Sequence, residues 1–493
     1  MDNNYATKRL VSEKVALLGL FVVSLLIAYL VTIAKSLLVL SAPIELRYTG
    51  LSVSVPNGNG WHSENQWKHQ ENGFALSSIF APNSGRAVAA AHCRYLFAAE
   101  KAGTQTKFEQ KASMVDGVIV KTDQTRKDNL VIDWAQIKRP QTPVSLFFGT
   151  IELPNNRRFD IEVRQITGEA NLSQKVFKRI IESLKFKDNE LLEAGSNLVA
   201  KIKSVGLRNL LDDQNQKVFF LIKTVKNQSE HTVGFTMDVV IGSDHPAPIV
   251  DSNSQTIRPP AKDTLDSSTP LEKTSFLTGS MGLAMPCGIG AGQSGIQGAG
   301  FFYTRSPYVQ ERLTSFQSDD SLNEFVWKSE THSAAERIGS EIIVDSNGAM
   351  TVRKSDEPQE KTYRLSSAAI PNIFLQQLLT VMLDSDKKEL VVDILRSDGT
   401  ITPTFISRAE TKDIASDKNA AYTLKLEPLG NRGFSEQVYI DQQKQISKRV
   451  LHQETTYILE RANLADILSE FPEQADSILR DNKIPIPASP EEI

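Results

Sequence analysis

An uninterrupted apolar run near the N-terminus constrains the fold of this 493-residue chain more than any other feature. Residues 15–34 read VALLGLFVVSLLIAYLVTIA, twenty positions without a charged side chain. At a rise of about 1.5 Å per residue, a helix of this length crosses a hydrocarbon core of roughly 30 Å. We therefore predict a single transmembrane helix over 15–34, after which apolar residues continue to about residue 42. The lipid bilayer is thus the first partner that the sequence predicts.

Charges on the two sides of the run predict its orientation. Three positive side chains precede it and two follow it closely: Lys8, Arg9 and Lys14 before, Lys35 and Arg47 after. This bias predicts a cytoplasmic tail over 1–14, a single pass through an inner membrane, and a periplasmic or other extracytoplasmic location for the rest. Secretory signals have shorter apolar regions of about 7–15 residues, so the run is typical of an uncleaved signal anchor. Cleavage after the small pair Ser41-Ala42 is the alternative.

The composition excludes several classes of protein. Hydrophobic residues make up 40% of the chain and charged residues 23%, which is enough apolar material for two or three cores. A net charge of −4 provides no basic field, so we expect no nucleic-acid partner. Cys93 and Cys287 are too few for a disulfide framework or a cysteine-rich zinc site. We expect two free thiols, with one bridge between them as the alternative.

Residues 45–187 show the pattern of an α+β domain. Alternating segments such as LRYTGLSVSVP, VSLFFGTIELP and RRFDIEVRQIT predict strands. The alanine-rich segment 85–101 and the segment 173–184 have helical spacing, so we predict a helix over each. This order predicts an α/β/α sandwich in which helices pack on an antiparallel sheet.

A second sheet-rich domain is predicted after a helical connector. The connector covers 188–214, with its helix over 190–211, and the second domain covers 215–475. The domain's segments predict antiparallel strands with long loops over 242–300. The proline-rich residues 476–493 predict a disordered tail. One helix, IPNIFLQQLLTVMLD, interrupts the strands and is expected to pack on the sheet.

The apolar stripe of this helix is the feature that suggests a binding site. Its members recur at helical intervals: Ile373, Leu375, Leu378, Leu379 and Met382. Such a stripe fits either simple packing on the sheet or the wall of a groove for an apolar ligand. Spacing alone does not separate the two, and we favour packing because buried helices outnumber helices that line ligands.

Each motif that resembles a catalytic or cofactor site lacks the context it needs. Residues 290–295 spell GAGQSG, formally a dinucleotide fingerprint, but Pro286 and Cys287 precede it where a strand is required. Ile296 replaces the last glycine of a nucleophile elbow. His62 and His69 have no common zinc-ligand spacing. We therefore predict no cofactor, no metal site, no catalytic residue and no enzymatic activity.

Two resemblances to known families add expectations. The opening YTGLSVSVPNGNGW and the closing FDIEVRQIT and QKVFKRIIESLKF make residues 45–187 similar to the PsbP/Mog1-like α/β/α fold, with a longer turn at 57–60. This resemblance implies a non-enzymatic accessory or binding domain. FLIKTVKNQSEHTVGFTMDV and QVYIDQQKQISKRV resemble, more distantly, the curved antiparallel sheets of LolA-like lipoprotein carriers. That resemblance implies a function in the envelope.

Taken together, these features predict a membrane-anchored extracytoplasmic binding or scaffold protein of a bacterial cell envelope. Its expected partner beyond the bilayer is another envelope protein or an apolar ligand. Two alternatives stay open. One is a LolA-like carrier of an apolar ligand, and the other is an envelope hydrolase whose residues come together only on folding.

Overall fold

The computed structural model describes residues 20–27, 38–70, 72–82, 86–100, 103–167, 171–211, 215–226, 229–243, 295–305, 309–333, 336–357, 359–409, 420–429 and 434–474. Its strands pair antiparallel except for one short parallel pair, and helices pack on the sheets, so the fold is of the α+β class. Residues 20–27 are helical with exposed apolar side chains. Among the described helices, none is long and apolar enough to cross a membrane. The remainder of 15–34, the tail 1–14 and the tail 476–493 lie outside the described residues.

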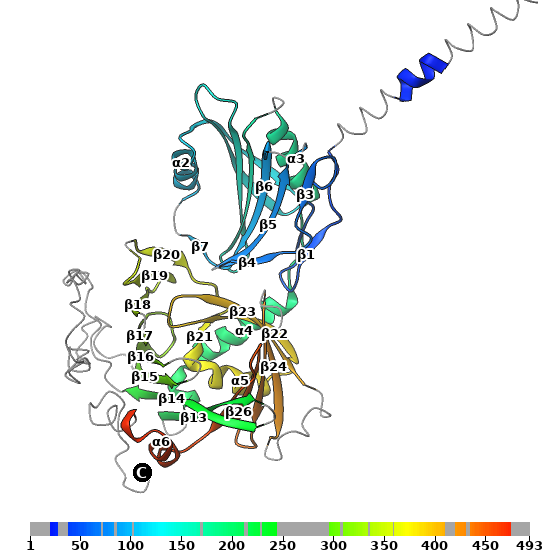
Figure 1. The fold of residues 1–493 in the computed structure, drawn as a ribbon. Helices are drawn as coiled ribbons and strands as arrows, with labels where there is room; N and C mark the ends of the chain where they lie inside the picture. Colours follow the sequence, from blue (N-terminus) through cyan, green and yellow to red (C-terminus); the bar gives the residue numbers. More distant parts are fainter. Residues whose placement is uncertain are drawn as a thin grey trace, which may run out of the picture.

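The first unit is built on an eight-stranded antiparallel sheet (Figure 1). Its order is β3-β5-β6-β11-β10-β9-β8, with β4 also paired to β5. The strands are β3 (Trp61–Ser63), β4 (Lys68–Gln70), β5 (Gly73–Phe80), β6 (Ala89–Leu96), β8 (Val118–Lys127), β9 (Leu130–Lys138), β10 (Ser145–Leu153) and β11 (Arg157–Gln165). A small sheet of β1 (Ile44–Leu46), β2 (Leu51–Val53) and β12 (Lys185–Phe186) lies beside it.

Helices cover both faces of this sheet. Helix α3 (Leu172–Ser183) buries Val176, Phe177 and Ile180 in the main core, as its apolar spacing predicts. Helix α2 (Thr104–Met114) packs Phe108 on the opposite face, in a separate cluster with residues of β9 and β10. The two faces therefore differ: one belongs to the main core, and the other carries a smaller, separate apolar cluster under α2.

The predicted helix over 85–101 is wrong. The segment forms β6 and the short β7 (Ala99–Glu100), and β6 pairs with β5 and β11 along its whole length. Ala89, Ala91 and Cys93 point to the core while His92 and Arg94 point away, which is the period-two alternation of a strand. The high helix propensity of alanine is overridden because the sheet needs small side chains on this buried strand.

The second unit is a curved sheet that winds around two helices (Figure 1). Its sixteen strands follow the order β21-β22-β23-β24-β25-β26-β27-β13-β14-β15-β16-β17-β18-β19-β20-β7. They are, besides β7, β13 (Asn215–Lys226), β14 (Ser229–Ser243), β15 (Gly295–Thr304), β16 (Gln310–Asp319), β17 (Phe325–Ser333), β18 (Arg337–Val344), β19 (Ala349–Lys354), β20 (Lys361–Arg364), β21 (Ala369–Pro371), β22 (Glu389–Leu395), β23 (Ile401–Arg408), β24 (Tyr422–Pro428), β25 (Ser435–Ile440), β26 (Ile446–His452) and β27 (Tyr457–Arg461).

The enclosed helices are α4 (Glu190–Val205) and α5 (Leu375–Leu383). A 3-10 turn (Leu207–Leu210) completes the predicted connector helix, and another (Asn372–Phe374) precedes α5. Gly195 of α4 lies so close to β22 that an added Cβ would be 1.9 Å from the carbonyl oxygen of Val391. Only glycine permits this approach, which brings the helix axis against the sheet.

The predicted boundaries of two segments need correction. The loops predicted over 242–300 are shorter at both ends, because β14 continues to Ser243 and β15 begins at Gly295; residues 244–294 lie outside the described part. The apolar continuation to residue 42 belongs to the folded body. Ser41 donates its amide to the Val55 carbonyl at 2.8 Å, and Leu38 packs on the main core.

The two units share one hydrophobic core. Buried side chains of α3, α4, α5 and the inner face of the second sheet belong to the same cluster. Strand β7 of the first unit pairs with β20, so the first unit supplies the last strand of the curved sheet. The ring of Tyr48 also stacks on that of Phe405 in β23, with centroids 4.4 Å apart. The described residues from position 38 onward thus form one continuous body.

Candidate functional site

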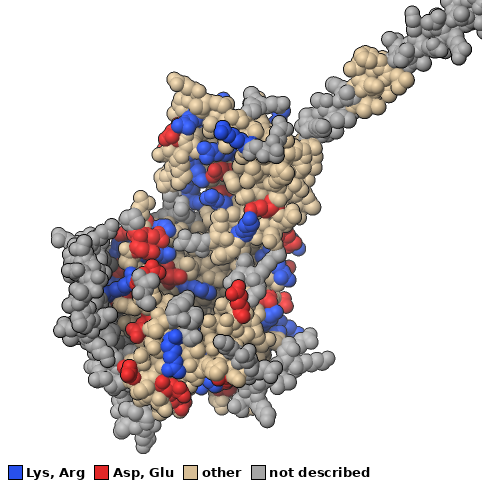
Figure 2. Space-filling model, viewed as in Figure 1, with Lys and Arg blue, Asp and Glu red and all other residues tan. Residues whose placement is uncertain are grey.

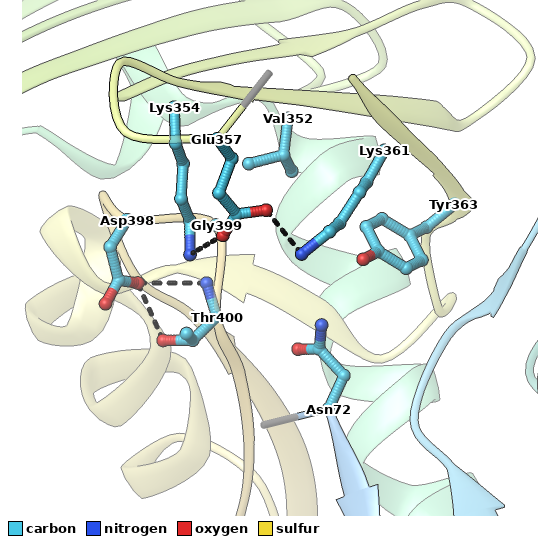
Figure 3. A pocket seen from close by; sticks show the side chains of 9 residues that line it. All are labelled: Asn72, Val352, Lys354, Glu357, Lys361, Tyr363, Asp398, Gly399 and Thr400. Atoms are coloured by element: carbon cyan, nitrogen blue, oxygen red, sulfur yellow. Dashed lines mark hydrogen bonds and ion pairs between the residues drawn. The ribbon is translucent and has the colours of Figure 1, made fainter. Parts of the chain in front are cut away.

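A small pocket lies where the first unit meets the second. Figure 3 shows the side chains around it, which come from the turn before β5, the β19–β20 hairpin and the β22–β23 turn: Asn72, Val352, Lys354, Glu357, Lys361, Tyr363, Asp398, Gly399 and Thr400. Its cavity volume is about 10 Å³, room for about one water molecule. In this conformation the pocket is too small for an organic substrate.

The charges of the pocket are paired with one another. The Glu357 carboxylate lies between two ammonium groups, 3.5 Å from Lys354 and 2.5 Å from Lys361 (Figure 3). The hydrogen bond from Lys361 lowers the pKa of Glu357. These side chains are partly exposed to water, so the pairs contribute little to stability.

The β22–β23 turn fixes the opposite wall of the pocket. Asp398 accepts hydrogen bonds from the amide of Thr400 at 2.9 Å and from its hydroxyl at 2.7 Å. Gly399 has φ +83°, and a Cβ there would lie 2.6 Å from Val352. Asn72 adds a buried amide oxygen that has no hydrogen-bond donor among the described residues. The Asp398 carboxylate is thus satisfied within its own turn.

A buried ion pair also joins the two units. Arg157 of β11 donates to the Asp393 carboxylate of β22 at 2.6 Å, and the two side chains are 1% and 0% exposed. Arg157 also donates to the hydroxyl of Tyr95 at 3.1 Å. Burial works against the charge on Arg157, but Asp393 and Tyr95 raise its pKa on balance. The guanidinium therefore stays charged, and the pair holds β11 against β22.

A row of polar side chains crosses the face of the first sheet beside α2. Ser77, His92 and Glu162 are cross-strand neighbours on β5, β6 and β11. The Ser77 hydroxyl lies 3.0 Å from Nδ1 of His92, and Lys111 of α2 donates to Glu162 at 2.7 Å. Figure 2 shows that charges of both signs are interspersed elsewhere on the visible face of the molecule. The row brings together the residue types of a serine hydrolase, which sequence inspection alone does not reveal.

The electrostatics of the row differ from those of a catalytic triad. Burial lowers the pKa of His92, although Glu162 opposes this effect, so the imidazole is neutral near pH 7. Burial alone would raise the pKa of Glu162, but Lys111 lowers it on balance. The carboxylate is therefore held by Lys111, whereas in a catalytic triad the acid orients the histidine.

A second group of charges lies inside the curved sheet. Asp238 of β14 is on the same strand face as Val240, which belongs to the main core. Burial raises the pKa of Asp238 to about 6, although Arg449 of β26 and Arg312 of β16 act in the opposite direction. Arg449 is also paired with Glu436 of β25. A carboxyl group with a pKa in this range is a frequent mark of functional sites and also of structural networks.

The five residues of the predicted groove lie together between α5, α4 and the sheet. Leu378, Leu379 and Met382 are 0% exposed, and Leu375 is 8% exposed. Ile373 precedes α5 in the 3-10 turn and is partly buried against the same core. The helix thus directs its stripe inward, and its side chains are packed in the structure described.

Other residues singled out in the sequence are separate from these sites. Gly295 begins β15, whereas Gly290, Gly292 and Cys287 lie outside the described residues. Cys93 is a free thiol whose pKa is raised to about 12 by burial. No group of three or more histidine, cysteine, aspartate or glutamate side chains in the described part of the chain is arranged to hold a metal ion.

The residues of the buried ion pair between the two units, Arg157 and Asp393, are not among those that the sequence pattern indicated as functional. Both stand in segments that read as strands, RRFDIEVRQIT and ELVVDIL. A charge inside an apolar strand is expected to be paired when buried, and that signal is present at Asp393. The partner, 236 positions away, is not predictable from spacing.

Comparisons with known proteins identify no family. No family model matches the chain, and no curated protein matches it. Among solved structures, a β-barrel-like protein of a domain of unknown function, DUF1849, from Brucella abortus has a TM-score of 0.29 at 7% identity, over 50% of this chain and 95% of that one. A structure from Bacteroides thetaiotaomicron has a TM-score of 0.19 at 9% identity, over 31% of this chain and 57% of that one. Both TM-scores are below one half, so neither likeness bears on fold or activity.

Proposed function

We propose that this protein is a single-pass, membrane-anchored binding or scaffold protein of the extracytoplasmic side of a bacterial envelope, without catalytic activity. The observation that carries the proposal is the junction: a shared core and the buried Arg157–Asp393 pair hold two units in one fixed arrangement. A scaffold requires such fixed geometry, whereas an enzyme or carrier requires space for its ligand. The pocket at this junction holds about 10 Å³.

Two further features support the proposal. The helical residues 20–27 expose their apolar side chains, Leu20 by 66% and Phe21 by 63%, as expected of a segment that lies in lipid. The resemblance of residues 45–187 to PsbP/Mog1-like domains and of the second unit to LolA-like sheets points to accessory and envelope roles. Neither resemblance identifies a binding or catalytic residue in this chain.

Native mass spectrometry of the full chain in detergent tests this function. We expect the polypeptide mass, alone or with another protein chain, and no stoichiometric small molecule. A bound apolar molecule that is lost in Leu379→Ala would instead establish a carrier. Ester hydrolysis that disappears in both Ser77→Ala and His92→Ala, but not in the matched surface variant Ser113→Ala, would establish a hydrolase.

A further inference from the structure

The outer face of β14 and β15 is apolar, although the outer face of a curved antiparallel sheet is usually polar. Five outward side chains form a cluster that is distinct from the main core: Phe235, Met237, Val239, Phe301 and Tyr303. All five are less than a tenth exposed. Something must therefore cover them, and the described chain supplies it.

The cover is the C-terminal helix α6 (Leu464–Glu470) and the residue after it, near β13 and β14 in Figure 1. Leu464, Ile467 and Phe471 enter the cluster at helical spacing and are 3%, 0% and 2% exposed. The ring of Phe471 lies 5.0 Å from that of Phe235 between centroids. The guanidinium of Arg305 lies 4.9 Å above the Phe471 ring, which selects an aromatic group at this position.

The apolar surface is wider than the helix that covers it. Phe219 and Leu221 of β13 and Leu313 of β16 border the cluster and are only partly buried. Helix α6 has seven residues and depends on this contact, because so short a helix is marginal alone in water. Its capping box, made by Asn463 and Asp466, fixes its start.

We propose that the outer face of β14–β15 is a helix-docking site, occupied in this chain by α6 and open in exchange to an amphipathic helix of a partner protein. The partner helix carries apolar side chains at the spacing of Leu464 and Ile467, followed by an aromatic residue under Arg305. Aromatic residues and methionine dominate the surface, as in sites that accept helices by packing. Exchange leaves the main core intact because the cluster is separate from it. The inference rests on the proposed binding role only for the existence of a partner.

A labelled peptide tests the site directly. The probe is a fluorescent synthetic peptide with the sequence of residues 462–474, and the receptor is the full chain in detergent. Ile467→Glu should displace α6 and expose the site, so the variant should bind the peptide at least about tenfold more tightly than the unmodified chain, in which α6 competes. The matched control Ser469→Glu adds the same charge on the exposed side of α6 and should bind like the unmodified chain.

The outcomes separate the two proposals. No binding by Ile467→Glu, or equal binding by all three chains, overturns the docking site. A probe peptide that itself carries Ile467→Glu must not bind. If Ile467→Glu does not fold, Phe471→Ala is the milder displacement with the same expectations. A lipid found by mass spectrometry would overturn the proposed function and leave this result unchanged.

Discussion

Burying the guanidinium of Arg157 and the carboxylate of Asp393 removes both from water, and their attraction must offset that loss. The geometry is incomplete, because Nε of Arg157 and Oδ2 of Asp393 have no hydrogen-bond partner among the described residues. Such a pair adds specificity to the junction more than stability. The charges align β11 with β22, and a displaced arrangement would leave one of them alone in the core.

Removing one partner of this pair should be costly. We expect Asp393→Ala to lower the free energy of unfolding by about 3–5 kcal/mol, because Arg157 then stays buried without a counter-charge. The double variant Arg157→Met, Asp393→Leu should recover most of the loss. Urea titrations of the single and double variants measure both values. A loss below about 1 kcal/mol for Asp393→Ala would mean that water reaches the site and that the junction is looser than described.

The carboxyl of Asp238 should make stability depend on pH. Its pKa in the folded chain, about 6, lies above the ordinary 3.8, so the unfolded chain releases the proton first. The contribution of protonated Asp238 to the free energy of unfolding is therefore fully present below about pH 4 and is lost as the pH rises to about 6. Asp238→Asn removes this effect, and its stability relative to the unmodified chain should rise by about 2–3 kcal/mol between pH 4 and 7.5.

Urea unfolding at the two pH values checks this expectation. Asp116→Asn, at a side chain that is 80% exposed, serves as the control for removing a carboxylate elsewhere on the molecule. If the difference between Asp238→Asn and the unmodified chain is the same at both pH values, Asp238 does not titrate in the range given. The substitution also alters the contacts of Arg312 and Arg449. This change in the free energy of unfolding is the same at both pH values, so it cancels in the difference between them.

At the scale of elements, periodicity predicted strands better than it predicted alanine-rich segments. The strands predicted in VSLFFGTIELP and RRFDIEVRQIT and the helix predicted in IPNIFLQQLLTVMLD occur where the pattern places them, since their apolar residues repeat with one clear period. The helix predicted over 85–101 was wrong because an alanine-rich run fits both the helical period and the strand period. Only pairing with the neighbouring strands decides which of the two forms. The polar row of Ser77, His92 and Glu162 was unpredictable for the same reason: it depends on the register of three strands.

Helix α5 offers a test between packing and ligand binding. Leu379 is 0% exposed, and truncating a buried leucine typically costs about 2–5 kcal/mol through lost contacts and a residual cavity. We expect Leu379→Ala to lower the melting temperature of the protein accordingly, as measured by calorimetry. An unchanged melting temperature together with lost fluorescence of a bound lipid probe would show that the stripe lines a groove.

At the scale of the whole molecule, the junction is what the sequence could not predict. Two domains were expected on either side of a helical connector, but α4 lies inside the second unit and its residues join the common core. Contacts such as Tyr48 on Phe405 link the first strands of the chain to a strand more than 350 positions later. No local pattern encodes such pairs, because each side chain would look equally ordinary in a single-domain core.

The structure indicates where the N-terminal segment can be removed without cutting into the folded part of the chain. Residues 38–42 belong to the fold, since Ser41 and Val39 form backbone hydrogen bonds with Val55 and Asn57. A chain that begins at residue 38 should therefore be soluble and folded, whereas a chain that begins at residue 43 should lose these bonds and melt at a lower temperature.

Under the proposed anchoring, the full chain should sediment with membranes, and the chain that begins at residue 38 should not. A reporter that is active only outside the cytoplasm, fused after residue 493, should give signal because the positive charges favour a cytoplasmic N-terminus. Replacing Leu20, Leu25 and Leu26 with lysine should release the full chain, since each charge at the centre of a spanning helix costs about 2.5–3.5 kcal/mol. The same three replacements by alanine keep the segment uncharged and serve as the control. A full chain that stays in the supernatant after membranes are pelleted, or a signal from a cytoplasm-only reporter at the C-terminus, would contradict the proposed anchoring or its orientation.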